Sequence, residues 1–313
     1  MADFSRSINQ SIIDNLKKEK LFIKCLRPDI EAGQVFMAIR GGYVSFYYKG
    51  GSLFTYKGKR KGVFESHFKY AFVPQPINTP YVRENKLADM TQRDNFTDAY
   101  EQIKERCALY AGLEAAGVSE LHRFSYAKKP RGQYVLLDTE IALDAVNDKA
   151  ADAALAISEG DRAHDTKVYA SPENQSTLTE KKRSTDRIDM LLMNEEGRLL
   201  FCEAKHFSNA ELASAVEDQL RRYRNQIEAK RSDIIAQYRE YVTSVNQLLD
   251  LKLLPPRELC DNCGLLIFGY DSDQERGRLA EIRARVKANG YPVYTMGNIS
   301  GIKTAETLFT ALA

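Results

Sequence analysis

The feature that most constrains the fold of this chain is a pair of apolar segments joined by a short polar turn. They are residues 187–193 (RIDMLLM) and 199–205 (LLFCEAK). Continuous apolar runs of this length are typical of strands buried on both faces of a sheet. Each run nevertheless carries charge, Asp189 in the first and Glu203 with Lys205 in the second. Buried charges are costly unless they have a partner or a function.

The turn predicts how the two strands pair. Residues 195–197 (EEG) fit a three-residue hairpin loop with glycine in the left-handed position. In that register Asn194 faces Arg198, so Asp189 faces Glu203. Directly opposed residues hold their Cβ atoms about 4.5–5.5 Å apart. A loop one residue longer or shorter would offset the two carboxylates, so the register is a hypothesis.

The residue types at this position favour one chemistry. Lys205 shares a face with Glu203 because strands have a period of two. Mg²⁺ prefers oxygen ligands and keeps several waters, so one or two carboxylates suffice; Mn²⁺ is the alternative ion. Such a metal polarises a phosphate oxygen and lowers the pKa of a bound water. A nearby lysine orients or deprotonates that water, or stabilises transition-state charge. The three residues therefore predict a site that cleaves phosphodiesters.

These residues resemble the motif of the PD-(D/E)xK nuclease superfamily, which includes many restriction enzymes and RecB-type nuclease domains. Asp189 matches the family aspartate and Glu203-Ala204-Lys205 matches (D/E)xK, whereas Ile188 stands where the family has proline. The resemblance implies Mg²⁺ held by Asp189, Glu203 and the backbone carbonyl of Ala204, with Lys205 as the catalytic lysine. It also implies a restriction-endonuclease-like fold.

A second match lies on the helix that follows. Gln219 and Tyr223 fit the Q-x-x-x-Y motif of RecB-type members, and residues four apart share a helix face. There they would hydrogen-bond near the site or near the nucleic acid backbone, and we count both among the catalytic candidates. Tyr223 also belongs to the apolar stripe of its helix, so ordinary packing explains it equally well.

Such sites are often assisted by an upstream acid. Glu140, in the expected strand 134–143, is the first candidate for a further metal ligand, although it would equally fit a solvent-facing strand end. Glu101 and Glu105 on the preceding helix are the next candidates. Asp186 is an alternative to Asp189, but it precedes the apolar run.

The rest of the chain predicts an α/β (α+β) fold in two domains. Residues 1–90 would form a small β-rich N-terminal domain that opens with a helix near 7–20. Residues 91–313 would form the nuclease-like domain, a mixed sheet flanked by helices. The expected elements are strands 35–39, 43–48 and 52–56, helix 95–115, strand 134–143, the hairpin, a helical region over 212–249 restarting at Ser232-Asp233, strand 264–270, helix 274–289 ending at Gly290, and strand 291–296.

The N-terminal part contains the most cationic segment, residues 49–69. Its candidate nucleic-acid-binding residues are Lys57, Lys59, Arg60 and Lys61, interleaved with aromatic residues. Cations would follow phosphates and an exposed ring would stack on a base. A solvated hairpin tip with core aromatics is an equally good interpretation.

Composition and cysteine spacing bear on the partners, the zinc binding and the cellular compartment of the chain. A net charge of +2 over 313 residues says nothing about partners, and five cysteines suit a reducing compartment. Cys260 and Cys263 have zinc-ligand spacing but lack a second ligand pair. No apolar run approaches the roughly 20 residues that cross a bilayer, so we expect a cytoplasmic protein without a membrane partner.

The sequence therefore predicts a Mg²⁺-dependent nuclease acting on nucleic acid, DNA in the first place. A non-catalytic nucleic-acid-binding or assembly module of the same fold is the main alternative, and an RNA-directed nuclease is another. Cutting both strands of a duplex with one site per chain would favour a homodimer.

Overall fold

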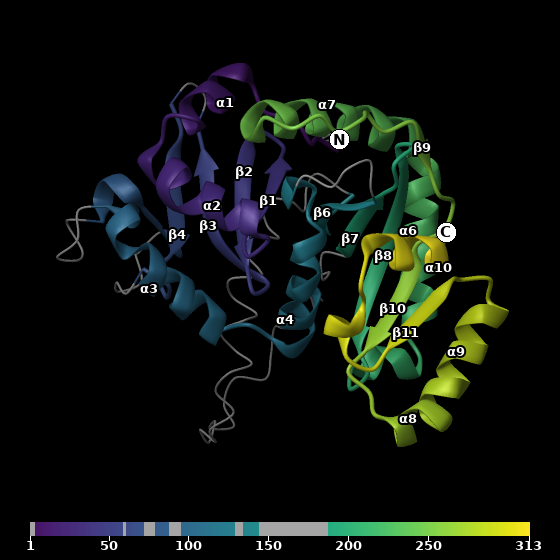
Figure 1. Ribbon diagram of the computed structural model, residues 1–313. Helices are drawn as coiled ribbons and strands as arrows, with labels where there is room; N and C mark the ends of the chain where they lie inside the picture. The colour runs from purple at the N-terminus through teal and green to yellow at the C-terminus, as the bar shows by residue number, and fades with distance from the viewer. Residues whose placement is uncertain (1–3, 59–60, 72–78, 88–94, 129–133, 144–186) are drawn as a thin grey trace, which may run out of the picture.

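The computed structural model describes residues 4–58, 61–71, 79–87, 95–128, 134–143 and 187–313. It has the α+β fold that the sequence predicts, with one antiparallel and one mixed sheet beside each other (Figure 1). The strands of the first sheet are β1 Phe36–Arg40, β2 Tyr43–Tyr48, β3 Gly51–Lys57, β4 Val63–His67 and β5 Tyr81–Arg83. Those of the second are β6 Val135–Ile141, β7 Ile188–Met193, β8 Arg198–His206, β9 Glu258–Leu259, β10 Gly264–Phe268 and β11 Val293–Met296.

The first sheet is an antiparallel meander in chain order from β1 to β5. Its first two turns place Gly42 and Gly50 at φ +85°, a conformation that glycine adopts without steric cost. The sequence predicted only three of the five strands. β4 and β5 are short, and the chain between them includes residues outside the described part. The predicted domain boundary at residue 90 also lies outside it.

The second sheet has the strand order β11-β10-β8-β7-β6, with β9 beside β8. β10 and β11 run parallel to β8, whereas β6 and β7 are antiparallel to their neighbours. Its central strand, β8, is buried along almost its whole length, as its apolar sequence predicted. The parallel strands end at the same edge of the sheet, which brings the end of β8 beside the end of β10.

Helices cover both sheets, and α7 extends across the top of the two in Figure 1. The helices are α1 Gln10–Leu16, η1 Phe22–Leu26, α2 Arg27–Ala32, η2 Glu84–Lys86, α3 Phe96–Leu109, α4 Leu113–Ser119, η3 Glu120–Phe124, η4 Tyr126–Lys128, η5 Ala210–Ala213, α6 Val216–Ala229, α7 Arg231–Leu249, α8 Ser272–Arg276, α9 Arg278–Ala288, η6 Ile299–Gly301 and α10 Ala305–Leu312.

Three predicted helices are interrupted. The helix expected over 95–115 is two helices, because Gly112 has an extended backbone between α3 and α4. The region 212–249 breaks at Lys230 and restarts at Arg231, one residue before the predicted Ser232-Asp233; the cap expected from those two residues is not formed, because α7 begins without a side-chain cap. The helix expected over 274–289 divides at Gly277. Its predicted end is confirmed, since Gly290 follows at φ +80°.

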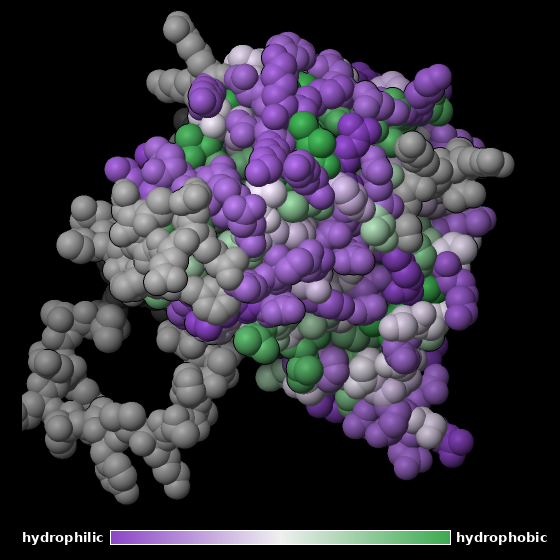
Figure 2. All heavy atoms as spheres, turned by 60° about the vertical axis from the view of Figure 1, so that its left-hand side comes forward, coloured by the Kyte–Doolittle hydropathy of each residue, from purple (hydrophilic) through white to green (hydrophobic). Residues whose placement is uncertain are grey.

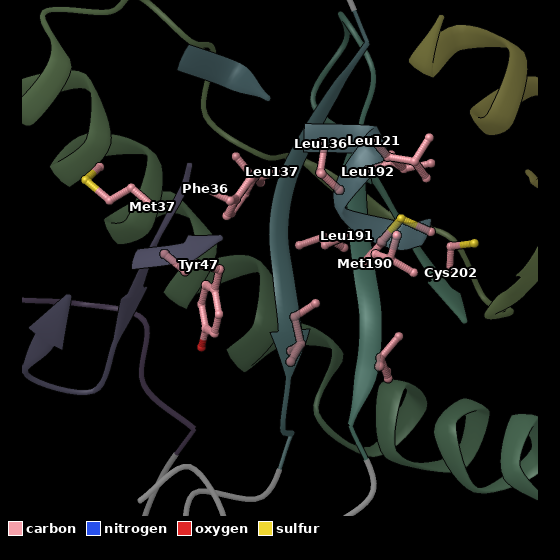
Figure 3. Close-up of a cluster of buried hydrophobic side chains, with 14 of the residues drawn as sticks. Phe36, Met37, Tyr47, Leu121, Leu136, Leu137, Met190, Leu191, Leu192 and Cys202 are labelled. Carbon is pink, nitrogen blue, oxygen red and sulfur yellow. The ribbon is translucent and has the colours of Figure 1, made fainter. Parts of the chain in front are cut away.

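The two sheets share one hydrophobic core. Figure 3 shows Phe36 of β1 beside Leu137 of β6, with Met190, Leu191 and Leu192 of β7 to their right. All of these residues belong to a single buried cluster. The face turned forward in Figure 2 is mostly hydrophilic, with apolar side chains in small separate groups.

A buried charge cluster joins the two sheets within this core. The register of β6 shifts at Leu137, a bulge that turns Asp138 away from the face it would otherwise share with Leu136. The Asp138 carboxylate accepts hydrogen bonds from Arg40 Nη1 at 2.8 Å and from Tyr238 Oη at 2.7 Å. It also pairs with Arg6 Nε at 3.2 Å. The side chains of both arginines and the aspartate are almost completely inaccessible to solvent.

Among the helices in the described ranges, none is long and apolar enough to cross a membrane.

Candidate functional site

The hairpin register has the geometry that the loop predicted. The Asn194 N–H donates to the carbonyl of Arg198 at 3.0 Å, and Gly197 has φ +83°. The ladder runs from Met193 opposite Leu199 to Met190 opposite Cys202. The ladder ends at that pair; one residue further along, the Asp189 side chain accepts a hydrogen bond from the Ala204 N–H, which brings it beside Glu203 on the neighbouring strand.

The neighbouring strand brings a third carboxylate into the same row. Thr139 pairs with Met190 and Ile141 with Ile188, so Glu140 lies across from Asp189. Glu140 is a non-glycine residue at φ +54°, a conformation that costs energy and is commonest at functional sites. Glu140, Asp189 and Glu203 therefore follow one another across β6, β7 and β8. The Glu140 carboxylate also pairs with Arg187 Nη1 at 3.3 Å.

Asp189 is held by the backbone of the facing strand. Its Oδ2 accepts a hydrogen bond from the Ala204 N–H at 2.7 Å. Burial raises the pKa of Asp189 well above the usual range, and the charges of Glu203 and Glu140 raise it further, with Lys205 acting against them. An aspartate with a raised pKa among other carboxylates is under electrostatic strain, because the charged form is disfavoured there.

Glu203 and Lys205 form the centre of the site. Glu203 is 2% exposed and Lys205 is 5% exposed, and their Oε1 and Nζ atoms are 2.8 Å apart. The other carboxylate oxygen, Glu203 Oε2, is buried without a hydrogen-bond partner. Burial raises the pKa of Glu203 to about 7 although the ammonium of Lys205 lowers it.

Lys205 stays protonated in this setting. Burial alone would lower its pKa, but the carboxylates of Glu203, Asp189 and Glu114 outweigh that effect and raise the pKa above its ordinary value. Its Nζ also lies 2.7 Å from Glu211 Oε2, in the short helix after β8. The lysine is therefore a fixed positive charge among acids.

Glu114 is a site residue that sequence reasoning missed. It lies in the first turn of α4, which packs on β8 and lies between the two sheets in Figure 1. Its Oε2 accepts from the His206 N–H at 3.0 Å and from Asn209 Nδ2 at 2.9 Å. Its Oε1 is 3.9 Å from Lys205 Nζ. No local pattern marks this residue, since it is remote in sequence from the hairpin.

The two other acids considered upstream lie elsewhere on α3. Glu101 is exposed and 3.5 Å from Lys104, and Glu105 is exposed. Glu114, on the next helix, is the upstream acid that the structure brings to Lys205. Asp186, the alternative to Asp189, lies outside the described residues.

Gln219 and Tyr223 lie together on α6, as the four-residue spacing predicted. Gln219 Nε2 donates to Tyr223 Oη at 2.9 Å, and the Tyr223 hydroxyl donates to the carbonyl of Arg187 at 2.5 Å. Tyr223 is fully buried, and Gln219 Oε1 is a buried oxygen without a partner. The pair thus fixes the backbone two residues before Asp189, which is a positioning role.

The donor set suits a magnesium-type ion. Within the described ranges, no group of three or more His, Cys, Asp or Glu side chains is arranged as a ready metal site. Two carboxylates are nevertheless sufficient for Mg²⁺, which keeps several waters. The charge of Glu203 raises the pKa of Asp189, burial raises the pKa of both, and Glu203 Oε2 has no hydrogen-bond partner. A divalent cation between them would satisfy that oxygen and remove the repulsion.

The predicted nucleic-acid-binding cations are placed only in part. Lys57 Nζ pairs with Glu65 Oε2 at 2.9 Å and lies over the rings of Tyr43 and Tyr81. Lys61 is exposed, and Lys59 and Arg60 are outside the described residues.

The cysteines with zinc-ligand spacing are free thiols. Cys260 and Cys263 are both buried, and burial raises the pKa of each.

In comparisons with known proteins, no protein-family model, no curated protein and no solved structure matches this chain.

Proposed function

We propose that this chain is a metal-dependent nuclease that hydrolyses phosphodiester bonds in nucleic acid, with DNA as the first substrate to test and Mg²⁺ or Mn²⁺ as the cofactor. The observation that supports it most is the row of Glu140, Asp189 and Glu203 across three neighbouring strands, with Lys205 beside it. The proposal includes membership of the PD-(D/E)xK superfamily, which rests on the motif residues and their register.

The carboxylates would hold the ion. Asp189, Glu203 and the carbonyl of Ala204 are the proposed ligands, and Glu140 is the candidate fourth. A bound Mg²⁺ would supply positive charge at a phosphate oxygen and acidify an attacking water. The Ala204 N–H keeps one Asp189 oxygen in place, so the second is the one directed to the ion.

Lys205 acts in this proposal through its charge. Because its pKa is raised, its amine holds its proton and is a poor base. An ammonium fixed 2.8 Å from Glu203 would stabilise the extra negative charge of the pentacovalent transition state. Among the roles open to the lysine from sequence, the electrostatic one agrees best with its surroundings.

Cleavage assays test the proposal. The wild-type chain is incubated with plasmid, linear and single-stranded DNA and with RNA, in Mg²⁺, Mn²⁺ or EDTA. We expect metal-dependent cleavage that is reduced about 10²–10³-fold in Lys205→Met, a loss typical of removing one electrostatic stabiliser.

Lys104→Met is the matched control for these assays. Lys104 is also a buried, paired lysine, 2.6 Å from Asp29, but it lies outside the site. Its variant should keep full activity per folded molecule. Cleavage that persists in EDTA, or that responds equally to both variants, would refute the nuclease proposal. Metal-independent binding without cleavage would favour the non-catalytic module, and preferential cleavage of RNA would favour the RNA-directed enzyme.

Metal binding should depend on pH around neutrality. Glu203 has a pKa of about 7, so it is largely protonated below that pH and must lose its proton to bind an ion. We therefore expect Mg²⁺ affinity to rise as pH increases through 7, by up to about tenfold per unit below it, with proton release. Calorimetry in buffers of different ionisation enthalpy measures the Mg²⁺ affinity and the number of protons released. A Mg²⁺ affinity that does not change over this pH range would contradict the assignment of Glu203 as a ligand.

A further inference from the structure

Two exposed leucines flank the connection between α3 and α4, just before the site residue Glu114. Leu109 is 77% exposed and Leu113 is 74% exposed, which makes them the most exposed large apolar residues of the described part of the chain. Leu109 is the last residue of α3 and Leu113 is the first of α4. A Cβ built on Gly112, between them, would meet nothing within 4 Å. The connection from Leu109 to Leu113 therefore protrudes into solvent.

The protruding tip is connected directly to the site. Leu113 precedes Glu114, whose carboxylate accepts from the His206 N–H at 3.0 Å and lies 3.9 Å from Lys205 Nζ. The tip is therefore one residue along the chain from a carboxylate that contacts the site. Single exposed apolar side chains are normal, but two on one short connection that leads into a site residue are a specific feature.

The base of the tip carries positive charge. Lys69, the last cation of the basic segment, lies with Nζ 5.5 Å from the ring centroid of Tyr110. Arg106 Nε donates to the carbonyl of Lys69 at 3.1 Å, which places a second cation on the same side. Apolar side chains at a tip with cations beneath them are complementary to a base stack flanked by phosphates.

We propose that Leu109 and Leu113 form a wedge that enters the base stack of a nucleic acid duplex, while Lys69 and Arg106 contact its phosphates. This inference rests on the proposed nuclease function and deepens it, because it makes the substrate a duplex that is locally unstacked beside the scissile bond. Leucine side chains inserted between base steps gain burial that offsets the cost of unstacking. The partly opened strand would then reach Asp189, Glu203 and Lys205.

The wedge is tested with Leu109→Ser/Leu113→Ser in an Asp189→Asn background, which prevents cleavage. The probes are a series of DNA duplexes, each with a single 2-aminopurine at a different position along one strand. We expect the Asp189→Asn parent to raise the 2-aminopurine fluorescence at one position. The added leucine substitutions should abolish that rise and weaken duplex binding about tenfold or more, the factor that 1.4 kcal/mol represents. Binding to single-stranded DNA should change little.

The chain provides a matched control. Ile23 and Leu254 are 51% and 52% exposed; Ile23 lies in η1 and Leu254 in the connection between α7 and β9. Ile23→Ser/Leu254→Ser, in the same background, should leave the fluorescence rise and the duplex affinity unchanged. Lys69→Ala should reduce affinity and lessen its salt dependence, as the loss of a phosphate contact requires.

The outcomes separate this inference from the proposed function. Unchanged fluorescence and affinity in the leucine variant, with cleavage by the wild type still dependent on Lys205, would overturn the wedge and leave the nuclease intact. A leucine-dependent fluorescence rise without any metal-dependent cleavage would support the duplex contact and refute the nuclease. A changed oligomeric state in sedimentation without an effect on fluorescence would show that the leucines contact another copy of the chain, and would overturn the wedge.

Discussion

Asp189→Asn is expected to abolish metal-dependent cleavage and, at the same time, to stabilise the fold. Asparagine keeps an oxygen that accepts from the Ala204 N–H, so the local geometry is retained. It removes one of two facing carboxylates, and with it a proposed metal ligand. We expect a loss of activity of about 10²–10³-fold or more, because the charge that holds the ion is lost.

The stability gain follows from the sign of the pKa shift. The pKa of Asp189 is raised in the folded chain by burial, Glu203 and Glu140. Folding thus disfavours the charged form of Asp189. The resulting cost in folding free energy is present at every pH above the ordinary pKa of an aspartate. Removing the charge should stabilise the chain by about 1–2 kcal/mol at neutral pH, a common gain when strain at a functional site is released. The gain in stability should disappear at low pH, where Asp189 is protonated in both the folded and the unfolded chain.

Thermal unfolding with and without Mg²⁺ measures this effect. The wild type should become more stable as Mg²⁺ is added, because the ion binds only the folded state, whereas Asp189→Asn should not respond. An Asp189→Asn chain that is less stable than the wild type without metal would show that Asp189 has a structural role. Equal activity in the variant and the wild type would remove Asp189 from the mechanism.

Asp138→Asn should have the opposite effect on stability. Asp138 is also buried, but Arg6, Arg40 and Tyr238 all donate to it. Neutralising it leaves two arginines buried without their counter-charge, and breaking a buried pair in this way costs about 3–5 kcal/mol. Because these residues come from both sheets and from α7, the loss should affect the whole chain in one transition.

Urea unfolding checks this expectation, with Asp218→Asn as the control. Asp218 makes an exposed pair with Arg221 at 2.7 Å, and such pairs contribute about 0–1 kcal/mol. A cost below about 1 kcal/mol for Asp138→Asn would mean that solvent reaches this cluster. Cleavage per folded molecule should remain near the wild-type value, because Asp138 lies outside the carboxylate row.

The sequence predicted the elements of the site whose positions depend on local rules. The three-residue loop with Gly197 determines the register of its own hairpin, so the pairing from Met193–Leu199 to Met190–Cys202, directly before Asp189 and Glu203, could be predicted without any structure. The four-residue spacing of Gln219 and Tyr223 likewise places both on one helix face. These predictions need only neighbouring residues and the fixed periods of helix and strand.

Other features depend on contacts between distant segments. Glu114 reaches the site because α4 packs on β8, and no spacing within the sequence relates it to Lys205. The bulge at Leu137 decides that Asp138 faces Arg6 and Arg40, whereas simple alternation along the strand would place it with Leu136. Lys57, a predicted nucleic-acid-binding residue, pairs with Glu65 on the neighbouring strand, a contact that no local pattern indicates.

By itself, the sequence determined the α+β class, the hairpin and the identity of its three charged residues, since turn chemistry and apolar periodicity act over a few residues. Only the tertiary structure decided how strongly those charges interact. Burial in the packed chain and the approach of Glu114 and Glu140 set the electrostatics of Asp189, Glu203 and Lys205. Burial and long-range charge are properties of the packed chain, and they determine whether the three residues can bind an ion.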